Sequence, residues 1–284
     1  MLLAALLCLS SCEAIVRPVH DTTAREAQTV SVFETEPEAT VPSEVTKPES
    51  LPESEAQTLP ETTAETEPYS RYNTYPTTLM YHCVHDEPYT QNTALFVRPY
   101  DLEEHCKALV ELDIDTLFAD EFGPVDKKSV ILTFDDGYED NYTYMFPIIK
   151  RYNIKVTVYM IAYKIDKPGY LTRDQIKEMS DSGLVQFGSH TLDHTSLTQL
   201  SEQQMKEQME GANWMISEIT GKEVTTIAYP SGDYNEIAIS VARTIYKFAY
   251  TTNAQSYYGQ DDMLLPRYAI LRGAGREQFL VYLQ

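Results

Sequence analysis

Basic side chains are scarce in this sequence. The 284 residues include 22 Lys and Arg against 43 Asp and Glu, which gives a formal net charge of −21. A field of that sign repels a phosphate backbone, so we expect no nucleic-acid partner. Hydrophobic residues still make up 43 % of the chain. That content can bury a sizeable core, which excludes a fully disordered protein.

Long hydrophobic runs are also lacking. The run at residues 1–9 is too short to span a bilayer as a helix. Ser10, Ser11 and Cys12 follow it, an order that resembles a bacterial lipoprotein signal, in which the cysteine is lipidated and becomes the new N-terminus. We therefore expect residues 1–12 to be a lipoprotein signal that anchors the protein through Cys12 to the extracellular face of the bacterial membrane. The alternative is a secretory signal with an incidental cysteine and a secreted protein.

Cysteine is sparse as well. Cys8 and Cys12 fall in the signal, which leaves Cys83 and Cys106 for the folded part. The sequence contains no Cys-x-x-Cys pair of the kind that binds metals. Two cysteines do not make a disulfide framework. One bridge between them is the alternative, and we expect buried free thiols.

Glycine is absent before residue 123, and the only aromatic residue in residues 31–68 is Phe33. Glu, Thr, Ser and Pro fill 27 of the 38 positions in that stretch. A segment of this composition cannot bury enough apolar surface to offset the entropy lost on ordering it. We expect residues 13–76 to be a disordered, acidic tether that holds a domain away from the membrane.

From residue 77 onward, short apolar runs alternate with amphipathic stretches. The expected strands are residues 78–81, 130–134, 155–161, 184–188, 225–229, 248–251 and 268–271. The expected helices are residues 100–112, 139–152, 173–182, 202–220, 236–246 and 276–283. This alternation predicts one α/β domain over residues 77–284, with parallel strands joined by helices in a barrel or an open sheet. In such folds the chemistry gathers at the carboxyl ends of the strands.

Polar residues follow several of these runs. Asp135 and Asp136 end one of them, and two adjacent carboxylates are costly to bury unless a cation or hydrogen bonds compensate. His190 and His194 follow another; four residues apart, they would face the same way on one helical turn and chelate one ion. Taken singly, these patterns also fit an ordinary turn and ordinary surface or core histidines.

Together, these motifs resemble the polysaccharide deacetylases of the NodB-like group, carbohydrate esterase family four. The strongest matches are T-F-D-D-G at residues 133–137 and H-T-L-D-H at residues 190–194, which fits the family's H-[ST]-x-x-H. Y-E-D-N-Y at residues 138–142 and Y-P-S-G-D-Y-N at residues 229–235 agree as well. The resemblance extends from residue 77 to the end of the sequence. It implies a distorted (β/α) barrel of about seven strands.

The resemblance also implies a role for each matched residue. Asp136, His190 and His194 would bind a divalent metal, zinc first, with cobalt, nickel or manganese as alternatives. Asp135 would be the general base. The amide N–H of Ser231 would donate a hydrogen bond to the oxyanion.

Three positions depart from the common family pattern. Ala228 occupies the position where many members have the arginine that orients the catalytic aspartate. Ser231 stands where an aromatic residue is frequent. No histidine follows Gly232, so the usual C-terminal general acid is absent.

A subgroup that resembles the deacetylases of poly-N-acetylglucosamine biofilm export has its motifs circularly shifted. This sequence is similar to it, with M-Y-H at residues 80–82 and L-P-R at residues 265–267. We therefore expect His82 to be the general acid, with His85 as the competing candidate, and Arg267 to orient the catalytic carboxylate. His105 lies inside a helical pattern and is expected to be structural.

The expected function is metal-dependent removal of N-acetyl groups from an extracellular N-acetylglucosamine polymer. Poly-N-acetylglucosamine is the first choice, peptidoglycan the second and O-acetylated xylan the third. The tyrosines of the domain favour a glycan, because aromatic faces stack on sugar rings, although most of them are expected to be ordinary core or surface residues. The alternative is a binding protein instead of an enzyme: a catalytically silent glycan-binding lipoprotein with the same fold. The retained set of carboxylates and histidines argues against it.

Overall fold

The computed structural model describes residues 75–257 and 259–283. The expected signal at residues 1–12, and all but the last two residues of the expected tether, lie outside the described residues. Within the described ranges, no helix has both the length and the apolar content needed to cross a membrane.

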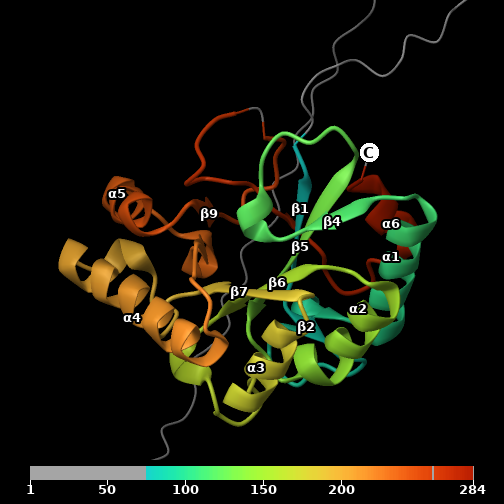
Figure 1. The fold of residues 1–284 in the computed structure, drawn as a ribbon, viewed down its shortest axis with the longest axis horizontal. Helices are drawn as coiled ribbons and strands as arrows, with labels where there is room; N and C mark the ends of the chain where they lie inside the picture. The colour runs from blue at the N-terminus through green and yellow to red at the C-terminus, as the bar shows by residue number, and fades with distance from the viewer. Residues whose placement is uncertain (1–74, 258, 284) are drawn as a thin grey trace, which may run out of the picture. The chain divides into compact units, whose positions relative to one another are not determined.

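The domain is built on a curled parallel sheet with helices on its outside (Figure 1). The strands lie in the order β10, β1, β5, β6, β7, β8 and β9, and β4 pairs with β5. Their bounds are β1 Thr77–Tyr81, β4 Asp115–Leu117, β5 Ser129–Asp136, β6 Val156–Met160, β7 Val185–Ser189, β8 Thr226–Ala228, β9 Phe248–Tyr250 and β10 Tyr268–Ala269. Two further short strands, β2 Cys83–Val84 and β3 Phe96–Val97, pair with each other. The expected barrel-like α/β fold of about seven strands is confirmed.

The α-helices of the described residues pack around this sheet. They are α1 Pro99–Glu111, α2 Phe146–Tyr152, α3 Arg173–Asp181, α4 Glu202–Thr220, α5 Glu236–Ile245 and α6 Arg276–Val281. In Figure 1, α1, α2 and α6 lie to the right of the curled sheet and α4 and α5 to its left. Helix α4 starts where the sequence predicts, because Ser201 and Gln204 form a capping box, and Gly221, at φ 68°, ends it.

The helix expected over residues 139–152 is interrupted. Asn141–Met145 is a π-helix, and α2 begins only at Phe146. Pro147 has no N–H to donate to the carbonyl four residues before it, so a regular α-helix cannot run through this turn.

Strand β5 is buried along its whole length, with alternate residues in different layers. Val130, Leu132 and Phe134 join the large core between the sheet and the helices. Ile131 belongs to a smaller cluster inside the curl of the sheet. Since strand residues alternate between faces, Asp135 shares the inner face with Ile131.

The segment that leads into β10 joins the two edges of the sheet. The N–H of Leu265 donates to the carbonyl of Ala249, and its own carbonyl accepts from the N–H of Thr251, both at 2.9 Å. Tyr268–Ala269 then pair with β1. Arg267 lies between these contacts and is fully buried. The guanidinium of Arg267 therefore lies inside the curled sheet.

Cys83 and Cys106 are buried free thiols, as expected. Burial raises the pKa of the Cys106 thiol to about 12, which leaves it protonated and unreactive near neutral pH.

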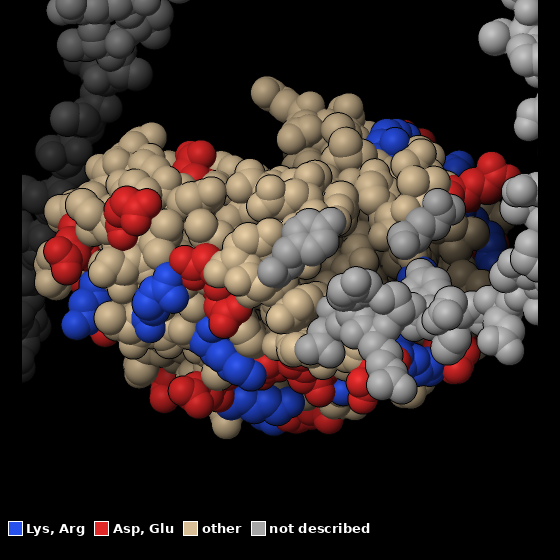
Figure 2. Space-filling model, turned by 90° about the horizontal axis from the view of Figure 1, so that it is seen from above, with Lys and Arg blue, Asp and Glu red and all other residues tan. Residues whose placement is uncertain are grey.

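Acidic and basic side chains intermingle along one rim of the face seen in Figure 2. The excess negative charge of the chain therefore does not gather as a single patch on this face.

Candidate metal and catalytic site

Asp136, His190 and His194 converge where β5 and β7 end. The Nε2 atoms of His190 and His194 lie 3.6 and 3.7 Å from Oδ1 of Asp136. One ligand atom from each residue lies within 4.8 Å of the others. These separations are too long for hydrogen bonds and suit an ion held between the donors at about 2.0–2.2 Å from each.

The two histidines do not share a helical turn, so that expectation was wrong. Residues 190–194 form a loop in which Thr191 (φ 66°) and His194 (φ 68°) are left-handed. The N–H of His194 donates to Oγ1 of Thr191 at 3.2 Å. This folded-back loop brings the ring of His194 to 4.7 Å from that of His190, centre to centre. A β-branched residue rarely adopts a positive φ, which marks the loop as strained.

His190 is prepared to act as a neutral ligand. It is buried, and its Nδ1 lies 2.7 Å from the carbonyl oxygen of Ala228. Because a carbonyl only accepts, Nδ1 holds the proton and Nε2 presents its lone pair to the cluster. Burial lowers the pKa of His190, which favours the neutral form. Two imidazole nitrogens and one carboxylate fit a divalent metal that keeps positions open for water and substrate.

The backbone at Asp136 has an unusual conformation, which directs its side chain to the cluster. Asp136 and Gly137 are both left-handed, at φ 73° and 75°. A Cβ on Gly137 would lie 2.3 Å from the sulfur of Met160, so this exit from β5 requires glycine. The two adjacent carboxylates thereby diverge, with Asp136 at the end of the strand and Asp135 inside the curl.

Asp135 is held by a buried arginine. Nη1 and Nη2 of Arg267 donate to its two carboxylate oxygens at 2.7 and 2.8 Å, and Nε of Arg267 donates to the carbonyl of Thr251 at 2.9 Å. Burial acts to raise the pKa of Asp135, but the charges of Arg267, His190 and His82 and the Arg267 hydrogen bonds outweigh it and lower the pKa to about 2. The carboxylate is therefore ionised and fixed in orientation.

His82 and His85 lie on either side of β2. His82 follows Tyr81 of β1, and Tyr81 pairs with Phe134, the residue that precedes Asp135 in β5. His85 is engaged elsewhere: its Nδ1 lies 2.7 and 3.0 Å from the backbone oxygen and nitrogen of Glu87. Of the two candidates, His82 is the one that directly follows the strand paired with β5.

Ser231 lies in the single 3-10 turn Pro230–Gly232 after β8 and has φ 58°. Within the described part of the chain, its amide N–H donates to no acceptor. The end of β8 lies next to His190 through the Ala228 contact, so the turn borders the cluster.

His105 has the structural place that the sequence predicts. It is fully buried in α1, and its Nε2 lies 2.8 Å from the carbonyl oxygen of Ala274. Its ring stacks on Phe279 with the centres 4.3 Å apart.

Two residues behind His82 had no role predicted from the sequence. Nδ2 of Asn141 donates to the carbonyl of His82 and to Oδ1 of Asp140, both at 2.9 Å. The hydroxyl of Tyr89 donates to Oδ2 of Asp140 at 2.7 Å. The Y-E-D-N-Y motif is the signal that contains both residues, although the motif alone does not say that they support the backbone of His82.

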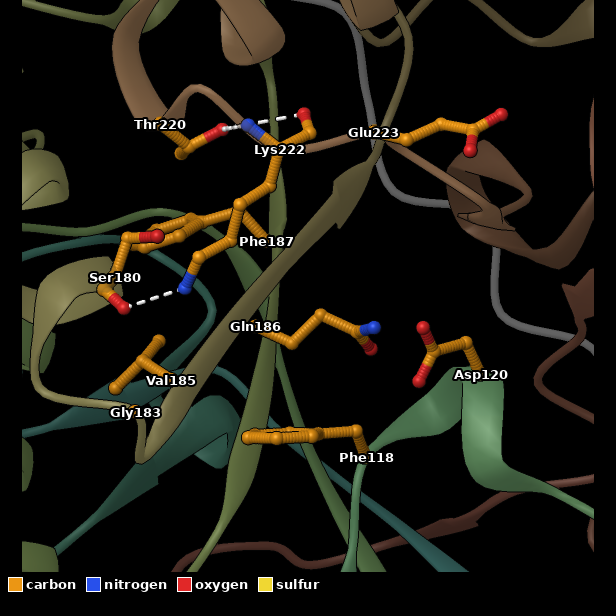
Figure 3. Close-up of a pocket in the computed structure, with 10 residues that line it drawn as sticks. All are labelled: Phe118, Asp120, Ser180, Gly183, Val185, Gln186, Phe187, Thr220, Lys222 and Glu223. Carbon is orange, nitrogen blue, oxygen red and sulfur yellow. Dashed lines mark hydrogen bonds between the residues drawn. The ribbon is translucent and has the colours of Figure 1, made fainter.

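A separate hollow lies away from these groups (Figure 3). Its volume is about 170 Å³, and Val185, Gln186 and Phe187 of β7 form part of its lining. His190 follows the opposite end of the same strand. The hollow therefore opens at the other end of the sheet and is not the site of the predicted chemistry.

Residues 122–246 match a family model described as polysaccharide deacetylase. The chain is 34 % identical over 182 residues to YxkH of Bacillus subtilis, whose name assigns it provisionally to the polysaccharide deacetylases; the match covers 61 % of the chain and 63 % of YxkH. It is 27 % identical over 153 residues to the peptidoglycan-N-acetylmuramic acid deacetylase PdaA of Bacillus subtilis, covering 52 % and 54 %. It is also 27 % identical over 157 residues to a poly-beta-1,6-N-acetyl-D-glucosamine N-deacetylase of Staphylococcus aureus, covering 48 % and 54 %. The chain thus spans less than two thirds of the length of these relatives.

Two solved structures of deacetylases are also similar to this chain. BC0361, a polysaccharide deacetylase from Bacillus cereus, superposes with a TM-score of 0.70 at 28 % identity, covering 74 % of the chain and 69 % of BC0361. The deacetylase PplD of Streptococcus pyogenes gives a TM-score of 0.69 at 28 % identity, covering 75 % and 100 %. The fold of this domain, and the sequence of residues 122–246, are thus similar to those of polysaccharide deacetylases.

Proposed function

We propose that this protein, whose residues 122–246 match a polysaccharide deacetylase family model, is a metal-dependent N-deacetylase of an extracellular N-acetylglucosamine polymer. The observation that carries the proposal is the convergence of Asp136, His190 and His194 at the end of the sheet, next to an ionised, buried Asp135. Attachment to the outer face of the membrane through Cys12 belongs to the same proposal.

Poly-N-acetylglucosamine is the proposed substrate. The support is the M-Y-H and L-P-R pattern, together with the contact that it produces between Arg267 and Asp135. The Staphylococcus aureus relative is named for that polymer. Peptidoglycan is the second candidate, because PdaA, of equal identity, is named for it.

Asp136, His190 and His194 would hold the metal, with zinc as the first choice because imidazole and carboxylate ligands suit it. When bound, the metal supplies Lewis acidity that polarises the amide carbonyl and lowers the pKa of water. Ala228 supports this role by fixing the tautomer of His190.

Asp135 accepts the proton of the attacking water. Arg267 keeps the carboxylate ionised and oriented, and each carboxylate oxygen retains a lone pair beyond its hydrogen bond to the guanidinium. A carboxylate of low pKa is a weak base, so the proton moves only as the new C–O bond forms and the water oxygen becomes acidic.

His82 donates a proton to the leaving amine, which is too basic to leave as an anion. The amide N–H of Ser231 donates to the oxygen of the tetrahedral intermediate. The C–N bond then breaks, the water oxygen remains in acetate, and the sugar retains a free amine.

The proposal is tested by acetate release from purified full-length protein with a panel of acetylated oligosaccharides: β-1,6-linked N-acetylglucosamine, peptidoglycan fragments and acetylated xylan. We expect release from the first, its loss with a chelator, and its recovery when a divalent metal is restored. Metal-independent release, or no release from any member of the panel, would contradict the proposal. Binding of a glycan without release would indicate the silent binding protein.

A further inference from the structure

A second cavity lies beside the segment that follows Asp136 in the chain. Its volume is about 340 Å³. Its lining consists of aromatic, acidic and small polar residues: His85, Tyr89, Glu139, Asp140, Thr143, Tyr144 and Gly169. Neither lysine nor arginine is among the described residues that line it.

Two sets of contacts tie this cavity to the catalytic groups. Asp140, in its wall, accepts a hydrogen bond from Asn141, which also donates to the carbonyl of His82. The ring of Tyr89 lies 6.2 Å from that of Tyr138, centre to centre. Tyr138 in turn follows the proposed metal ligand Asp136 by two residues. A ligand in the cavity would therefore adjoin the leaving-group side of the site.

Among the described residues, no lysine or arginine pairs with the carboxylates of the cavity; the imidazole of His85, itself in the lining, acts electrostatically on Asp140. Glu139 is exposed, and within the described residues its carboxylate forms no ion pair. Asp140 is 5 % exposed, and the side-chain donors to its carboxylate are a tyrosine hydroxyl and an amide. Burial raises the pKa of Asp140 against the effect of these donors. A cation bound opposite would offset that burial.

The aromatic walls suit a ligand with both a cation and an apolar face. The ring of His85 meets Tyr89 and Tyr144 edge to face, with centres 5.7 and 5.3 Å apart. Tyr89 and Tyr144 are 49 % and 38 % exposed. An aminosugar has C–H bonds that pack on such rings and an ammonium group that pairs with carboxylates and aromatic faces.

We infer that this cavity binds a glucosaminium unit, a sugar of the polymer that has already lost its acetyl group, beside the N-acetylglucosamine unit that undergoes hydrolysis. The inference rests on the proposed function, because that reaction supplies both the neighbouring unit and its amine. Each turnover then creates a ligand for this cavity, and the enzyme acts faster next to a unit that it has already deacetylated.

The test compares three β-1,6-linked trisaccharides: one fully acetylated, and two with a single glucosamine at either end. The readout is kcat/KM for acetate release per acetyl group by the metal-loaded full chain. We expect one of the two singly deacetylated trisaccharides to exceed the fully acetylated one by about three- to tenfold, the range of an aromatic and ionic contact at a partly exposed site.

Glu139→Gln, which keeps the shape of the side chain and removes its charge, is expected to abolish this preference. Glu218→Gln, on the exposed face of α4, is the matched control and is expected to retain it. Thermal melting of both variants shows whether each is folded. Equal rates on the three trisaccharides by the unmodified protein, or a preference that survives Glu139→Gln, would overturn the inference while the proposed function stands. No release from any of the three would overturn both.

Discussion

Backbone strain is concentrated in the residues that form the site. Of the seven non-glycine residues with positive φ in the described part of the chain, four are Asp136, Thr191, His194 and Ser231. Such conformations cost on the order of 1–3 kcal/mol each, so the surrounding contacts must hold them. The donor atoms are thus arranged in advance by the fold, which is the condition for stabilising a transition state without reorganisation.

Replacement of Asp135 separates metal binding from proton transfer. Asp135→Asn keeps the shape of the side chain and removes the base, so turnover is expected to fall by about 10²- to 10⁴-fold. Metal content, measured by atomic absorption on the same preparation, is expected to be unchanged. Loss of the metal together with activity would make Asp135 a ligand rather than the base.

The choice between the two histidines is tested by a pair of variants. His82→Ala removes the proposed proton donor and is expected to lower kcat by about 10²-fold or more. His85→Ala is expected to have a smaller effect on kcat, because that side chain is engaged with Glu87. The opposite order of effects would assign the acid to His85.

At the scale of elements, the end of β5 depends on glycine. Gly137→Ala places a Cβ against the sulfur of Met160 at a residue with φ 75°. We expect a loss of about 1–3 kcal/mol in the free energy of unfolding, measured by urea denaturation. Gly123→Ala is the control, since nothing lies within 4 Å of the added Cβ and φ is not positive there. If Gly137→Ala and Gly123→Ala were equally stable, the proposed backbone strain at the end of β5 would be contradicted.

His105, buried where α1 meets α6, predicts a pH dependence of stability. Burial lowers the pKa of His105 from 6.5 to about 4. Between pH 6.5 and pH 4, His105 is protonated in the unfolded chain and neutral in the folded protein. Stability therefore falls as the pH is lowered, and the effect ends near pH 4. Between pH 7 and 5 this amounts to about 2 kcal/mol. Urea denaturation with chelator present should show this loss and show less of it in His105→Gln; an equal loss in the variant would exclude His105 as its source.

Most regular elements were predicted from the sequence to within a few residues. Periodicity locates β5 and α4, because one has continuous burial and the other a capped, amphipathic pattern. Periodicity does not report the π-helix Asn141–Met145 or the loop of residues 190–194, whose shapes depend on a proline and on a strained threonine. The short strands β2, β3 and β4 were missed, because none of the expected strands covers them.

The site residues were predicted by family motif rather than by geometry. The motif order identified Asp135, Asp136, His190 and His194. It did not show that the carbonyl of Ala228 orients His190, nor that Asn141 supports the backbone of His82. Such supporting contacts join residues far apart in the chain, and only the folded sheet brings them together.

At the scale of the whole domain, the site exists because the sheet curls until its edges meet. The segment around Arg267 bonds to β9 and then to β1, and β1 lies beside β5, which carries Asp135. The proposed metal ligands come from β5 and from the loop after β7, with β6 between these strands. The proposed catalytic groups therefore belong to the fold as a whole and are expected to be lost together when it unfolds.

The central claim is that one ion is held by Asp136, His190 and His194. Anomalous X-ray diffraction at the zinc absorption edge, on crystals of the zinc-loaded protein, tests it most directly. We predict a single peak about 2.0–2.2 Å from Oδ1 of Asp136 and from the Nε2 atoms of both histidines, absent from crystals of His190→Ala and His194→Ala. No peak at this position, or a peak that persists in both variants, would contradict the account.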